Sequence, residues 1–476
     1  MWISIYNFFS YIVFGYTITS MACLVVLCIL SLKAQYNLRI NMPDDDTIRY
    51  MLKGSPLTPS VSIIASAYNE EHTIINNVKS LFNIYYPKYE IIIVNDASSD
   101  NTLQLLIDEF KLQEVPFVNS LRVPSKPIKH VYRSTEEQYS KLIVVDKERG
   151  GRKSDGINAG INVCNSRYFV NTDVDCIIEP LAIYRMMWHV VNSHDPVIGV
   201  GATMLISNGC TIKDGRVTKA AVPNNPLALY QQMEYMRSFH ISKLGWSSLN
   251  ALPNISGGFG LFDTEVVIKS GGYDTSSMAE DVDMLLRMVT YMKNSGQPFR
   301  IAQVPTVCCW TEGPFTPSML YRQRVRWARG LCEIVSNHRK LFFNHKYGYF
   351  GISTLPYIFV FEFLAPLLEI AGIIFSGWLI SIGKINWETA IVIIGMIYIF
   401  SVSLSFIVIS FDYATRSVQW KNTFWSYLKL IFAGITEPIL YHVFITICSI
   451  RGYISYLFNT TATWKSIRRK TTGAPN

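Results

Sequence analysis

Apolar residues gather at the two ends of this chain of 476 residues and leave a polar middle. Residues 8–32 contain no charge, and long apolar runs return after residue 347, at 355–382, 389–411 and 428–450. Because a helix needs roughly 20 apolar residues to cross a hydrocarbon core about 30 Å thick, the first three runs predict membrane-spanning helices. The run at 8–32 has neither a basic start nor a small-residue cleavage site, which favours a retained anchor over a signal peptide.

Charged residues interrupt two of the later apolar runs. Glu362 and Glu369 share one helical face of the run 355–382, so we expect them to face protein, water or a ligand rather than lipid. The run 428–450 contains Glu437, Pro438 and His442. It predicts an interfacial or re-entrant element that lies against the other helices.

The basic residues predict the orientation. Lys33 and Arg39 directly follow the first apolar run, and the tail carries four more, Lys465, Arg468, Arg469 and Lys470. The positive-inside rule then puts the N-terminus outside and the polar middle in the cytosol, at a bacterial-type cytoplasmic membrane. Three crossings satisfy this orientation and four do not, so the run 428–450 is not expected to cross.

The polar middle alternates short apolar strands with helical patterns. VSIIASAYNE at 61–70 and YEIIIVNDAS at 89–98 are β-branched runs that end in polar residues, and further strands are predicted at 141–146 and 167–171. This order predicts βαβ units with a parallel sheet, where ligands bind outside the carboxyl ends of the strands. Residues 115–140, with Pro124 and Pro127, are predicted to be an excursion from the sheet.

The composition agrees with a membrane protein. With 49% hydrophobic and 16% charged residues, the chain is too apolar for a purely soluble protein. The net charge of +8 fits a cytosolic domain beside anionic lipid and an anionic substrate, although a positive-inside bias alone also explains it. The nine cysteines show no metal-ligand spacing, so reduced and packed thiols are predicted.

Two carboxylates stand one residue apart just after the predicted strand 167–171. Asp173 and Asp175 have a spacing that suits a hard divalent cation, although an acidic turn that satisfies its own backbone looks the same. Upstream, Gly150 and Gly151 let the backbone approach a ligand, and Lys153 can reach a phosphate. The sequence has no Walker A motif, which disfavours a P-loop nucleotidase.

Five elements follow one another in a defined order: Asp96, RKSDGINAG at 152–160, DVD at 173–175, MAEDVDM at 278–284 and QRVRW at 323–327. In this order they resemble the membrane-integrated family 2 glycosyltransferases, the group of cellulose, chitin, hyaluronan and poly-N-acetylglucosamine synthases. The likeness covers roughly residues 58–335, and QRVRW matches the QxxRW signature of that family. The chain departs from the family in having Ala97 instead of glycine after Asp96, and Ala279 instead of threonine before the ED pair.

The resemblance implies a role for each motif. It assigns the nucleotide of a UDP-sugar to six residues, Ala67, Tyr68, Glu70, Asp96, Lys153 and Asp155. It assigns a Mg²⁺ or Mn²⁺ ion to Asp173 and Asp175, with Asp173 also on the substrate side, and the acceptor sugar to the segment that contains Gly257 and Gly258. In the QxxRW motif, Gln323 and Arg326 would hold the donor diphosphate and Trp327 would stack on the acceptor.

The chemistry of the reaction also calls for a base. An acceptor hydroxyl has a pKa far above 7, so its proton must be taken up as the oxygen attacks. By the resemblance this base is Asp281, with Glu280 beside it, although a helix-capping carboxylate would look the same in the sequence. A single base without a second catalytic carboxylate predicts direct displacement with inversion, so an α-linked donor gives a β-linked product.

The predicted architecture is an α/β GT-A domain, with a mixed, mainly parallel sheet and helices on both faces, joined to transmembrane and interfacial helices. Residues 318–337 are amphipathic and predict a helix in the plane of the membrane interface. The expected parts are a transmembrane helix at 1–33, the GT-A domain at 34–312, amphipathic helices with QxxRW at 313–346, transmembrane or re-entrant helices at 347–450 and a basic cytosolic tail at 451–476.

The predicted function is an inverting, metal-dependent membrane glycosyltransferase that extends a β-linked polysaccharide from UDP-N-acetylglucosamine or, second, UDP-glucose, with processive synthesis coupled to export. Two alternatives stay open: a non-processive enzyme that extends a lipid-linked sugar, and an inactive sugar-binding subunit of a synthase complex. The expected partners are the UDP-sugar, the polysaccharide or lipid-linked acceptor, the bilayer, and export or accessory subunits, with no nucleic acid.

Overall fold

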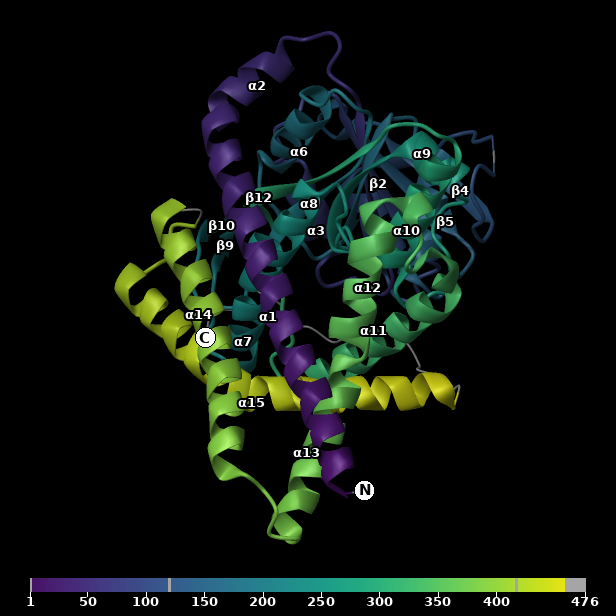
Figure 1. The fold of residues 1–476 in the computed structure, drawn as a ribbon. Helices are drawn as coiled ribbons and strands as arrows, with labels where there is room; N and C mark the ends of the chain where they lie inside the picture. The colour runs from purple at the N-terminus through teal and green to yellow at the C-terminus, as the bar shows by residue number, and fades with distance from the viewer. Residues whose placement is uncertain (1, 119–120, 416–417, 459–476) are drawn as a thin grey trace. The chain divides into compact units, whose positions relative to one another are not determined.

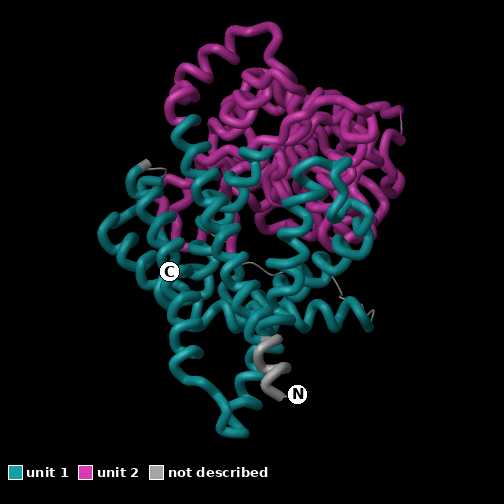
Figure 2. Tube along the Cα trace, in the orientation of Figure 1, with its two compact units in different colours: residues 1–37, 222–249, 314–462 teal, residues 38–221, 250–313, 463–476 magenta. Residues whose placement is uncertain are grey.

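The computed structural model describes residues 2–118, 121–415 and 418–458 (Figure 1). The chain divides into two compact units (Figure 2): unit 1 comprises residues 1–37, 222–249 and 314–462, and unit 2 comprises residues 38–221, 250–313 and 463–476. The segment 222–249 therefore groups with the apolar helices, although it falls inside the expected GT-A range. The basic residues of the tail, 465 to 470, lie outside the described residues.

Unit 2 is built on a sheet of ten strands in the order β3-β4-β5-β2-β1-β6-β11-β8-β12-β7. The strands are β1 (Val61–Ala67), β2 (Tyr89–Asn95), β3 (Leu112–Glu114), β4 (Ile128–Ser134), β5 (Leu142–Lys147), β6 (Tyr168–Asp173), β7 (Ile177–Ile178), β8 (Val197–Ile206), β11 (Phe259–Asp263) and β12 (Arg300–Thr311). Strands β9 (Thr211–Lys213) and β10 (Arg216–Lys219) form a separate pair.

Most strands of the large sheet run in one direction. Strands β5, β2, β1 and β6 are parallel, β8 and β12 are parallel to each other, and β11 runs antiparallel to both β6 and β8. Only β4, β7 and β11 therefore run against the others. This confirms the mixed, mainly parallel sheet and the four strands predicted at 61–70, 89–98, 141–146 and 167–171.

The prediction that residues 115–140 leave the sheet is wrong. Residues Ile128–Ser134 form β4, which pairs antiparallel with β5, and β3 pairs with β4 at the edge. Among the side chains of β4 only Val131 is buried, so the strand has no buried apolar run for a sequence pattern to detect. Pairing with β5, rather than burial of its own side chains, makes this segment a strand.

Seven α-helices accompany the sheet: α2 (Asp45–Lys53), α3 (Ile74–Leu81), α4 (Thr102–Glu109), α5 (Lys153–Val163), α6 (Ala182–Val191), α9 (Thr264–Lys269) and α10 (Glu280–Asn294). Helix α6 packs against β8 and β12, and α5 packs against β1 and β2. Two glycines allow α5 to lie close to β1, because a Cβ atom on Gly156 would fall 2.2 Å from Ser66 Oγ and one on Gly160 would fall 2.3 Å from Ile64 Cγ2.

Unit 1 is helical. Its helices are α1 (Trp2–Asn41, up to residue 37), α7 (Pro226–Arg237), π-helical η2 (Ser238–Lys243), α8 (Leu244–Ser248), α11 (Pro317–Asn337), α12 (Leu355–Tyr357) between π-helical η5 (Phe350–Thr354) and η6 (Ile358–Phe363), α13 (Ala365–Ser381), α14 (Trp387–Thr415) and α15 (Thr423–Leu457). Within the described ranges four helical segments are long and apolar enough to cross a membrane: Ser10–Asn41, Phe350–Ser381, Trp387–Ala414 and Thr423–Leu457.

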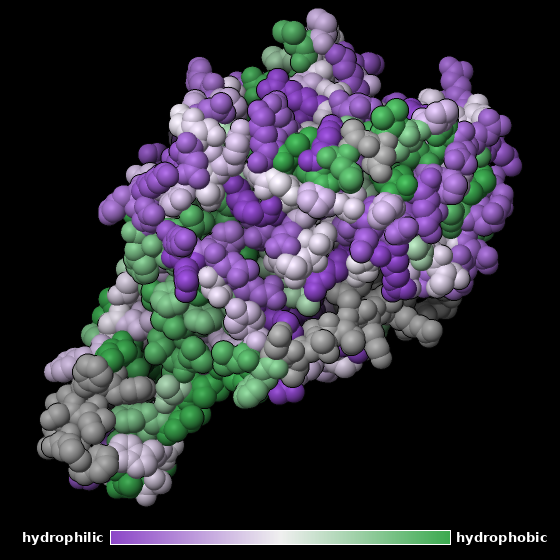
Figure 3. Space-filling model, turned by 90° about the vertical axis from the view of Figure 1, so that its right-hand side faces the viewer, coloured by the Kyte–Doolittle hydropathy of each residue, from purple (hydrophilic) through white to green (hydrophobic). Residues whose placement is uncertain are grey.

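These segments expose apolar side chains that a soluble protein would bury. Ile374 on α13 and Ile394 on α14 are 67% and 68% exposed, and apolar surface forms a continuous region at the lower left of Figure 3. Contiguous apolar surface of this kind marks contact with lipid or with another protein. The chain is therefore a membrane protein, as its composition predicts.

Helix α15 differs from the other long apolar segments. In Figure 1 its last part, in yellow, runs across the direction of α13 and α14. It packs most extensively on the amphipathic helix α11. This arrangement supports an interfacial position, although its length and composition also suffice for a crossing, so three crossings remain a prediction.

Glu369 has partners within the protein, which is one of the predicted environments. Its carboxylate lies 3.0 Å from His442 Nε2 and accepts a 2.6 Å hydrogen bond from the Thr446 hydroxyl, both on α15. The polar residues that interrupt the run 428–450 thus supply partners for the carboxylate on α13.

Candidate active site

The strand ends of unit 2 bring the predicted site residues to one edge of the sheet. In the pairing register, Asn95 stands beside Ala67 and beside Asp146, while Ser66 stands beside Asp173. Strands β1, β2, β5 and β6 therefore end at the same level. The residues that follow them gather at the carboxyl edge, where the sequence pattern predicted a ligand site.

A buried lysine connects two of these strand ends. Lys147, the last residue of β5, is fully buried, and its Nζ lies 2.6 Å from Asp96 Oδ1 and 2.5 Å from Asp155 Oδ2. Both aspartates are 4% exposed. Since a buried carboxylate without a partner is costly, this lysine offsets the cost of burying the two acids next to each other.

Backbone amides complete the surroundings of Asp96. Its Oδ1 accepts a 2.7 Å hydrogen bond from the Gly150 amide and its Oδ2 a 2.9 Å bond from the Gly151 amide. Gly151 has a φ of +73°, and a Cβ on Gly150 would fall 2.0 Å from Asp155 Oδ2, so the loop requires glycine at both positions. The glycine pair thus wraps the carboxylate of Asp96, which retains room for one further donor at Oδ2.

The departure from the family at Ala97 has a visible consequence. Ala97 has a φ of +53°, in the left-handed region that a side chain disfavours by roughly 1–2 kcal/mol. The glycine that usually follows the aspartate would adopt this conformation without that cost. The turn nevertheless keeps its shape, because Asn95 Oδ1 accepts from the Ser98 amide at 3.3 Å.

Lys153, the first residue of α5, reaches two other parts of the site. Its Nζ lies 2.6 Å from Asp173 Oδ1 and donates a 2.5 Å hydrogen bond to the Gly257 carbonyl. That carbonyl also accepts a 3.1 Å bond from Asn171 Nδ2 on β6. The lysine predicted to reach a phosphate therefore lies beside the acidic pair predicted to hold a metal ion.

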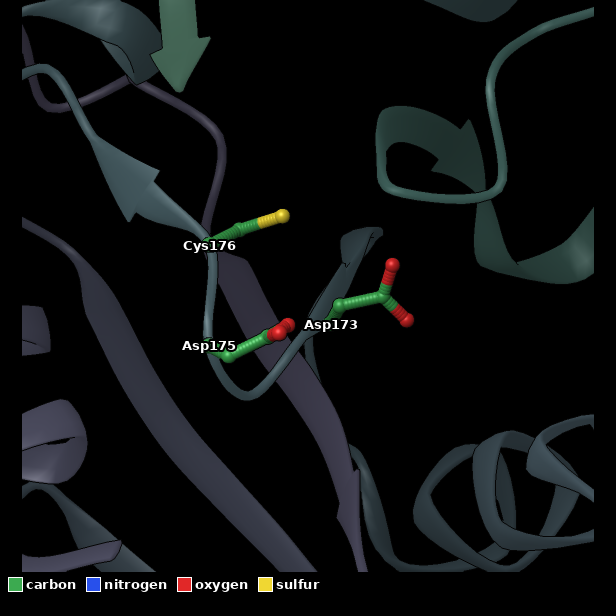
Figure 4. Close-up of side chains that lie close together, drawn as sticks. All are labelled: Asp173, Asp175 and Cys176. Atoms are coloured by element: carbon green, nitrogen blue, oxygen red, sulfur yellow. The ribbon is translucent and has the colours of Figure 1, made fainter. Parts of the chain in front are cut away.

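Asp173 is the last residue of β6, and Asp175 and Cys176 lie in the turn that follows it (Figure 4). Each of these three residues offers a ligand atom within 4.8 Å of the others. Two partly exposed carboxylates fit Mg²⁺ or Mn²⁺, which prefer oxygen ligands. The thiol is a poorer match, because Cys176 is 2% exposed and lies against Cys309, whose thiol pKa is raised well above its ordinary value by burial and then by Cys176.

Asp281 lies in the first turn of α10. Its Oδ2 accepts from the Gly257 amide at 3.2 Å and from Asn254 Nδ2 at 3.3 Å, while its Oδ1 accepts from the Val282 amide at 2.9 Å. Burial, followed by the negative charges of Asp281 and Glu280, holds the pKa of Tyr273 well above its usual range. Tyr273 is thus a protonated phenol close to both carboxylates.

The turn at Ser256–Gly258 connects the groups around it. Strand β11 runs antiparallel to β6, with Phe259 opposite Thr172, so the turn before it reaches the carboxyl edge. Asp173 donates its amide to the Gly258 carbonyl at 3.3 Å, and a Cβ on Gly258 would fall 2.6 Å from Met204 Cε. One reversed strand therefore carries the backbone that Asp281, Lys153 and Asp173 share.

Tyr68 and Glu70 lie at the rim of this edge. The guanidinium of Arg149 stacks 4.1 Å from the Tyr68 ring centroid and donates to its hydroxyl. Glu70 Oε2 accepts from the Thr73 hydroxyl at 3.0 Å.

The residues of the QxxRW motif lie on α11 in unit 1. This helix spans Pro317–Asn337 and begins at Thr316, whose hydroxyl accepts from the Met319 amide, which confirms the predicted amphipathic helix. Trp327 is 39% exposed. Gln323 Oε1 is buried without a hydrogen-bond partner among the described residues, so it can accept from a ligand. The roles of these residues and of Arg326 remain predictions.

The sequence analysis missed several residues that shape these regions. In unit 2 they are Lys147, Arg149, Asn171 and Asn254; in unit 1 they are Arg324, Glu234 and Tyr441. Lys147 could have been found from the sequence, because a lysine that directly follows the apolar run LIVVD needs a buried partner. The sequence holds no such signal for the other missed residues, because their partners are far away in the sequence.

Two family matches cover most of the chain. Residues 62–208 match glycosyl transferase family 2, and residues 231–460 match glycosyl transferase family group 2. A solved structure, the mannosyltransferase PcManGT from Pyrobaculum calidifontis in complex with GDP-Man and Mn²⁺, aligns with 93% of this chain and 100% of its own at a TM-score of 0.51 and 15% identity. That likeness supports the fold.

Curated relatives are named poly-β-1,6-N-acetyl-D-glucosamine synthase. The protein of Staphylococcus aureus strain COL is 28% identical over 327 residues, which is 67% of this chain and 66% of that synthase. The protein of Staphylococcus epidermidis strain ATCC 35984 is 27% identical over 276 residues, 58% of this chain and 55% of that synthase. The matches thus span just under two thirds and just over half of these relatives. With both family matches and the ordered motifs, the chain belongs to the family 2 glycosyltransferases.

Proposed function

We propose that the protein is an inverting, metal-dependent glycosyltransferase that adds N-acetylglucosamine from a UDP-sugar to a β-linked polysaccharide. The observation that carries the proposal is the backbone of Gly257, whose carbonyl accepts from Lys153 and whose amide donates to Asp281. A cation that can reach a phosphate and a carboxylate that can act as a base, both held against the backbone of one residue, suit displacement at an anomeric carbon. The name of the curated relatives supports N-acetylglucosamine and a β linkage, with glucose as the second choice of sugar.

The nucleotide would lie over the carboxyl ends of β1, β2 and β5. Asp96 Oδ2 has room for one more donor, which an N–H group of the uracil would supply, and Ala67, Tyr68 and Glu70 border the same edge. Asp155 takes part indirectly, because Lys147 joins it to Asp96. The base of the nucleotide is thus recognised by a carboxylate whose position the chain fixes without the ligand.

Two kinds of groups would compensate the negative charge on the leaving diphosphate: donor side chains and a metal ion. Lys153 can donate to a phosphate oxygen from its place beside Asp173, and Gln323 and Arg326 of the QxxRW motif are proposed to add further donors. Asp173 and Asp175 would hold Mg²⁺ or Mn²⁺, which when bound neutralises charge that grows on the diphosphate. Both kinds of contact would strengthen as the bond to the sugar breaks, and this is the requirement for catalysis.

Asp281 is proposed to take the proton of the acceptor hydroxyl. Its two oxygens are held by the Gly257 and Val282 amides and by Asn254, so the carboxylate is fixed in orientation before the acceptor arrives. Glu280 lies next to it, and both carboxylates act on Tyr273. In this proposal the acceptor oxygen attacks from the Asp281 side and the diphosphate leaves from the opposite side, which inverts the anomeric centre.

The polymer is proposed to form at the cytosolic face and to leave through the membrane part of the protein, with or without export or accessory subunits. Trp327 would stack on the acceptor sugar, since an indole offers a flat apolar face that tolerates successive sugar units. Amphipathic α11 would hold this residue at the membrane interface, where a growing chain has to pass.

Purified protein incubated separately with UDP-N-acetylglucosamine, UDP-glucose and other UDP-sugars tests the function. We expect UDP release with UDP-N-acetylglucosamine above all, and a long β-linked product that a linkage-specific glycosidase degrades. A product extended by one sugar would instead identify the non-processive enzyme. If no UDP-sugar gives UDP release above that of an Asp281→Asn control, the protein is an inactive sugar-binding subunit.

Substitution of Lys147 tests the nucleotide site. Lys147→Met leaves two buried carboxylates without their cation, and breaking a buried pair in this way typically costs about 3–5 kcal/mol. We expect a lower thermal unfolding midpoint and at least about tenfold weaker UDP binding by calorimetry. The matched control is Lys79→Met, which removes an exposed ion pair with Glu109 and should change stability by no more than about 1 kcal/mol. Equal effects of the two substitutions would contradict the role of Lys147.

Removal of the metal ligand tests the cation site. Asp175→Asn should abolish transfer and lower the affinity for Mn²⁺, measured by electron paramagnetic resonance of free Mn²⁺. Chelator should inhibit the wild-type protein, and added Mg²⁺ or Mn²⁺ should restore it. The control is Asp274→Asn, a carboxylate in a loop of unit 2 that caps the Ser276 amide. Full activity in excess chelator would remove the metal from the proposal.

Substitution of Asp281 separates catalysis from binding. Asp281→Asn keeps an oxygen that can accept from the Gly257 amide but cannot take up a proton at neutral pH. Transfer should slow by about 10²- to 10⁴-fold, the usual effect of losing one general base, while UDP affinity stays within about twofold. The exposed carboxylate in Glu265→Gln serves as the control. Parallel losses of binding and turnover would make Asp281 a structural residue.

A further inference from the structure

The second residue of the QRVRW sequence is buried in a hydrogen-bonded network within unit 1. The Arg324 guanidinium donates to both carboxylate oxygens of Glu234 on α7, each at 2.6 Å, and to the Tyr441 hydroxyl on α15 at 2.9 Å. Tyr441 in turn donates to Glu234 Oε2 at 2.8 Å. These three side chains therefore join α7, α11 and α15 in a closed ring of contacts.

Arg324 is the buried cation of this network. Arg324 is 6% exposed, and against the opposing effect of burial the carboxylate of Glu234 holds the pKa of Arg324 above its usual value. A bidentate arginine–carboxylate pair fixes the plane of the guanidinium as well as its position. Lysine at this position would keep the charge and lose the plane.

The same guanidinium lies under the indole of Trp327. Its central carbon is 4.3 Å from the ring centroid, the distance of a cation–π contact. Residues 324 and 327 are one helical turn apart on α11, so one face of the indole is covered while the side chain as a whole stays 39% exposed. The uncovered face is the surface that a ligand can reach.

Helix α15 packs against the turn of α11 that carries Trp327. A Cβ atom on Gly452 would fall 2.5 Å from Ala328 Cβ and 2.7 Å from the Val325 carbonyl oxygen. The backbone of α15 therefore touches α11 directly beside Trp327, and only glycine allows this approach. Below this contact, Tyr453 packs with Ala328 and Cys332.

We propose that Arg324 is a positioning residue for the acceptor: with Glu234, Tyr441 and Gly452 it fixes the indole of Trp327 as the platform on which the growing sugar chain rests. This inference depends on the proposed function, because it takes Trp327 to contact the acceptor. Arg324 itself touches neither donor nor acceptor. It acts by holding one face of the indole and thereby presenting the other.

Product length is the decisive measurement, because a loose platform releases the acceptor earlier without changing the donor site. In Arg324→Lys and in Gly452→Ala, the mean length of the product per active molecule should fall about tenfold, the effect of about 1.4 kcal/mol in acceptor binding. UDP affinity should stay within about twofold of the wild-type value. Tyr441→Phe removes one hydroxyl and should give an intermediate length while the protein folds normally.

Matched controls exist for both substitutions. Arg322→Lys changes an exposed arginine on the same helix, and Gly372→Ala adds a Cβ that meets no atom within 4 Å. Both should give products of wild-type length. If Arg324→Lys and Tyr441→Phe also give wild-type length, with only the yield of folded protein reduced, the network is merely structural and the inference is wrong.

The positioning role of Arg324 can still be tested if the proposed function is wrong. If the wild-type protein adds one sugar and makes no polymer, the same variants are compared by KM for the acceptor. A rise of about tenfold confined to the acceptor KM would still support the positioning role, and an unchanged acceptor KM would overturn it. Failure of the proposed function is seen in the wild-type product, whereas failure of this inference is seen only in the variants.

Discussion

The backbone of Gly257 makes the contacts on which the candidate active site depends. Its carbonyl accepts from Lys153 and Asn171, and its amide donates to Asp281. Three elements, α5, β6 and α10, thereby share the backbone of one residue, and none of these contacts uses a side chain at position 257. The reversed strand β11 makes this possible, because a parallel strand would place its preceding turn at the opposite edge of the sheet.

Two lysines, the buried Lys147 and the partly exposed Lys153, lie against the acids of the candidate site in unit 2. Lys147 separates Asp96 from Asp155, and Lys153 lies against Asp173, so each lysine accompanies an acid that the proposed function uses. Bringing carboxylates together without such partners would cost more than the fold can supply. The site therefore holds negative charge ready for a cation and for N–H donors, while the protein stays stable before any ligand binds.

The sequence predicted the parts of the fold that depend on local patterns. The apolar runs gave β1, β2, β5 and β6, and the amphipathic spacing gave α11, because burial of their own side chains decides these elements. It failed at β4, which is a strand by pairing alone, and at the pairs Lys147–Asp96 and Arg324–Glu234, whose members lie 51 and 90 residues apart. The motifs predicted which residues converge at the carboxyl edge, since parallel strands end together. They did not predict the contacts between those residues, which depend on the register of the sheet and on one reversed strand.

The order of the unit 1 segments along the chain affects how the protein folds during its synthesis. Its segments 1–37, 222–249 and 314–462 are separated in the sequence by parts of unit 2, so neither unit is complete when its first segment leaves the ribosome. Helix α7 must wait for α11 and α15, which supply the partners of Glu234. Such long-range contacts slow folding and leave apolar surface uncovered in the meantime. Glu234 on α7 therefore gains its full set of partners only after α15 has been made, and a truncation that removes α15 should destabilise α7, which is synthesised much earlier.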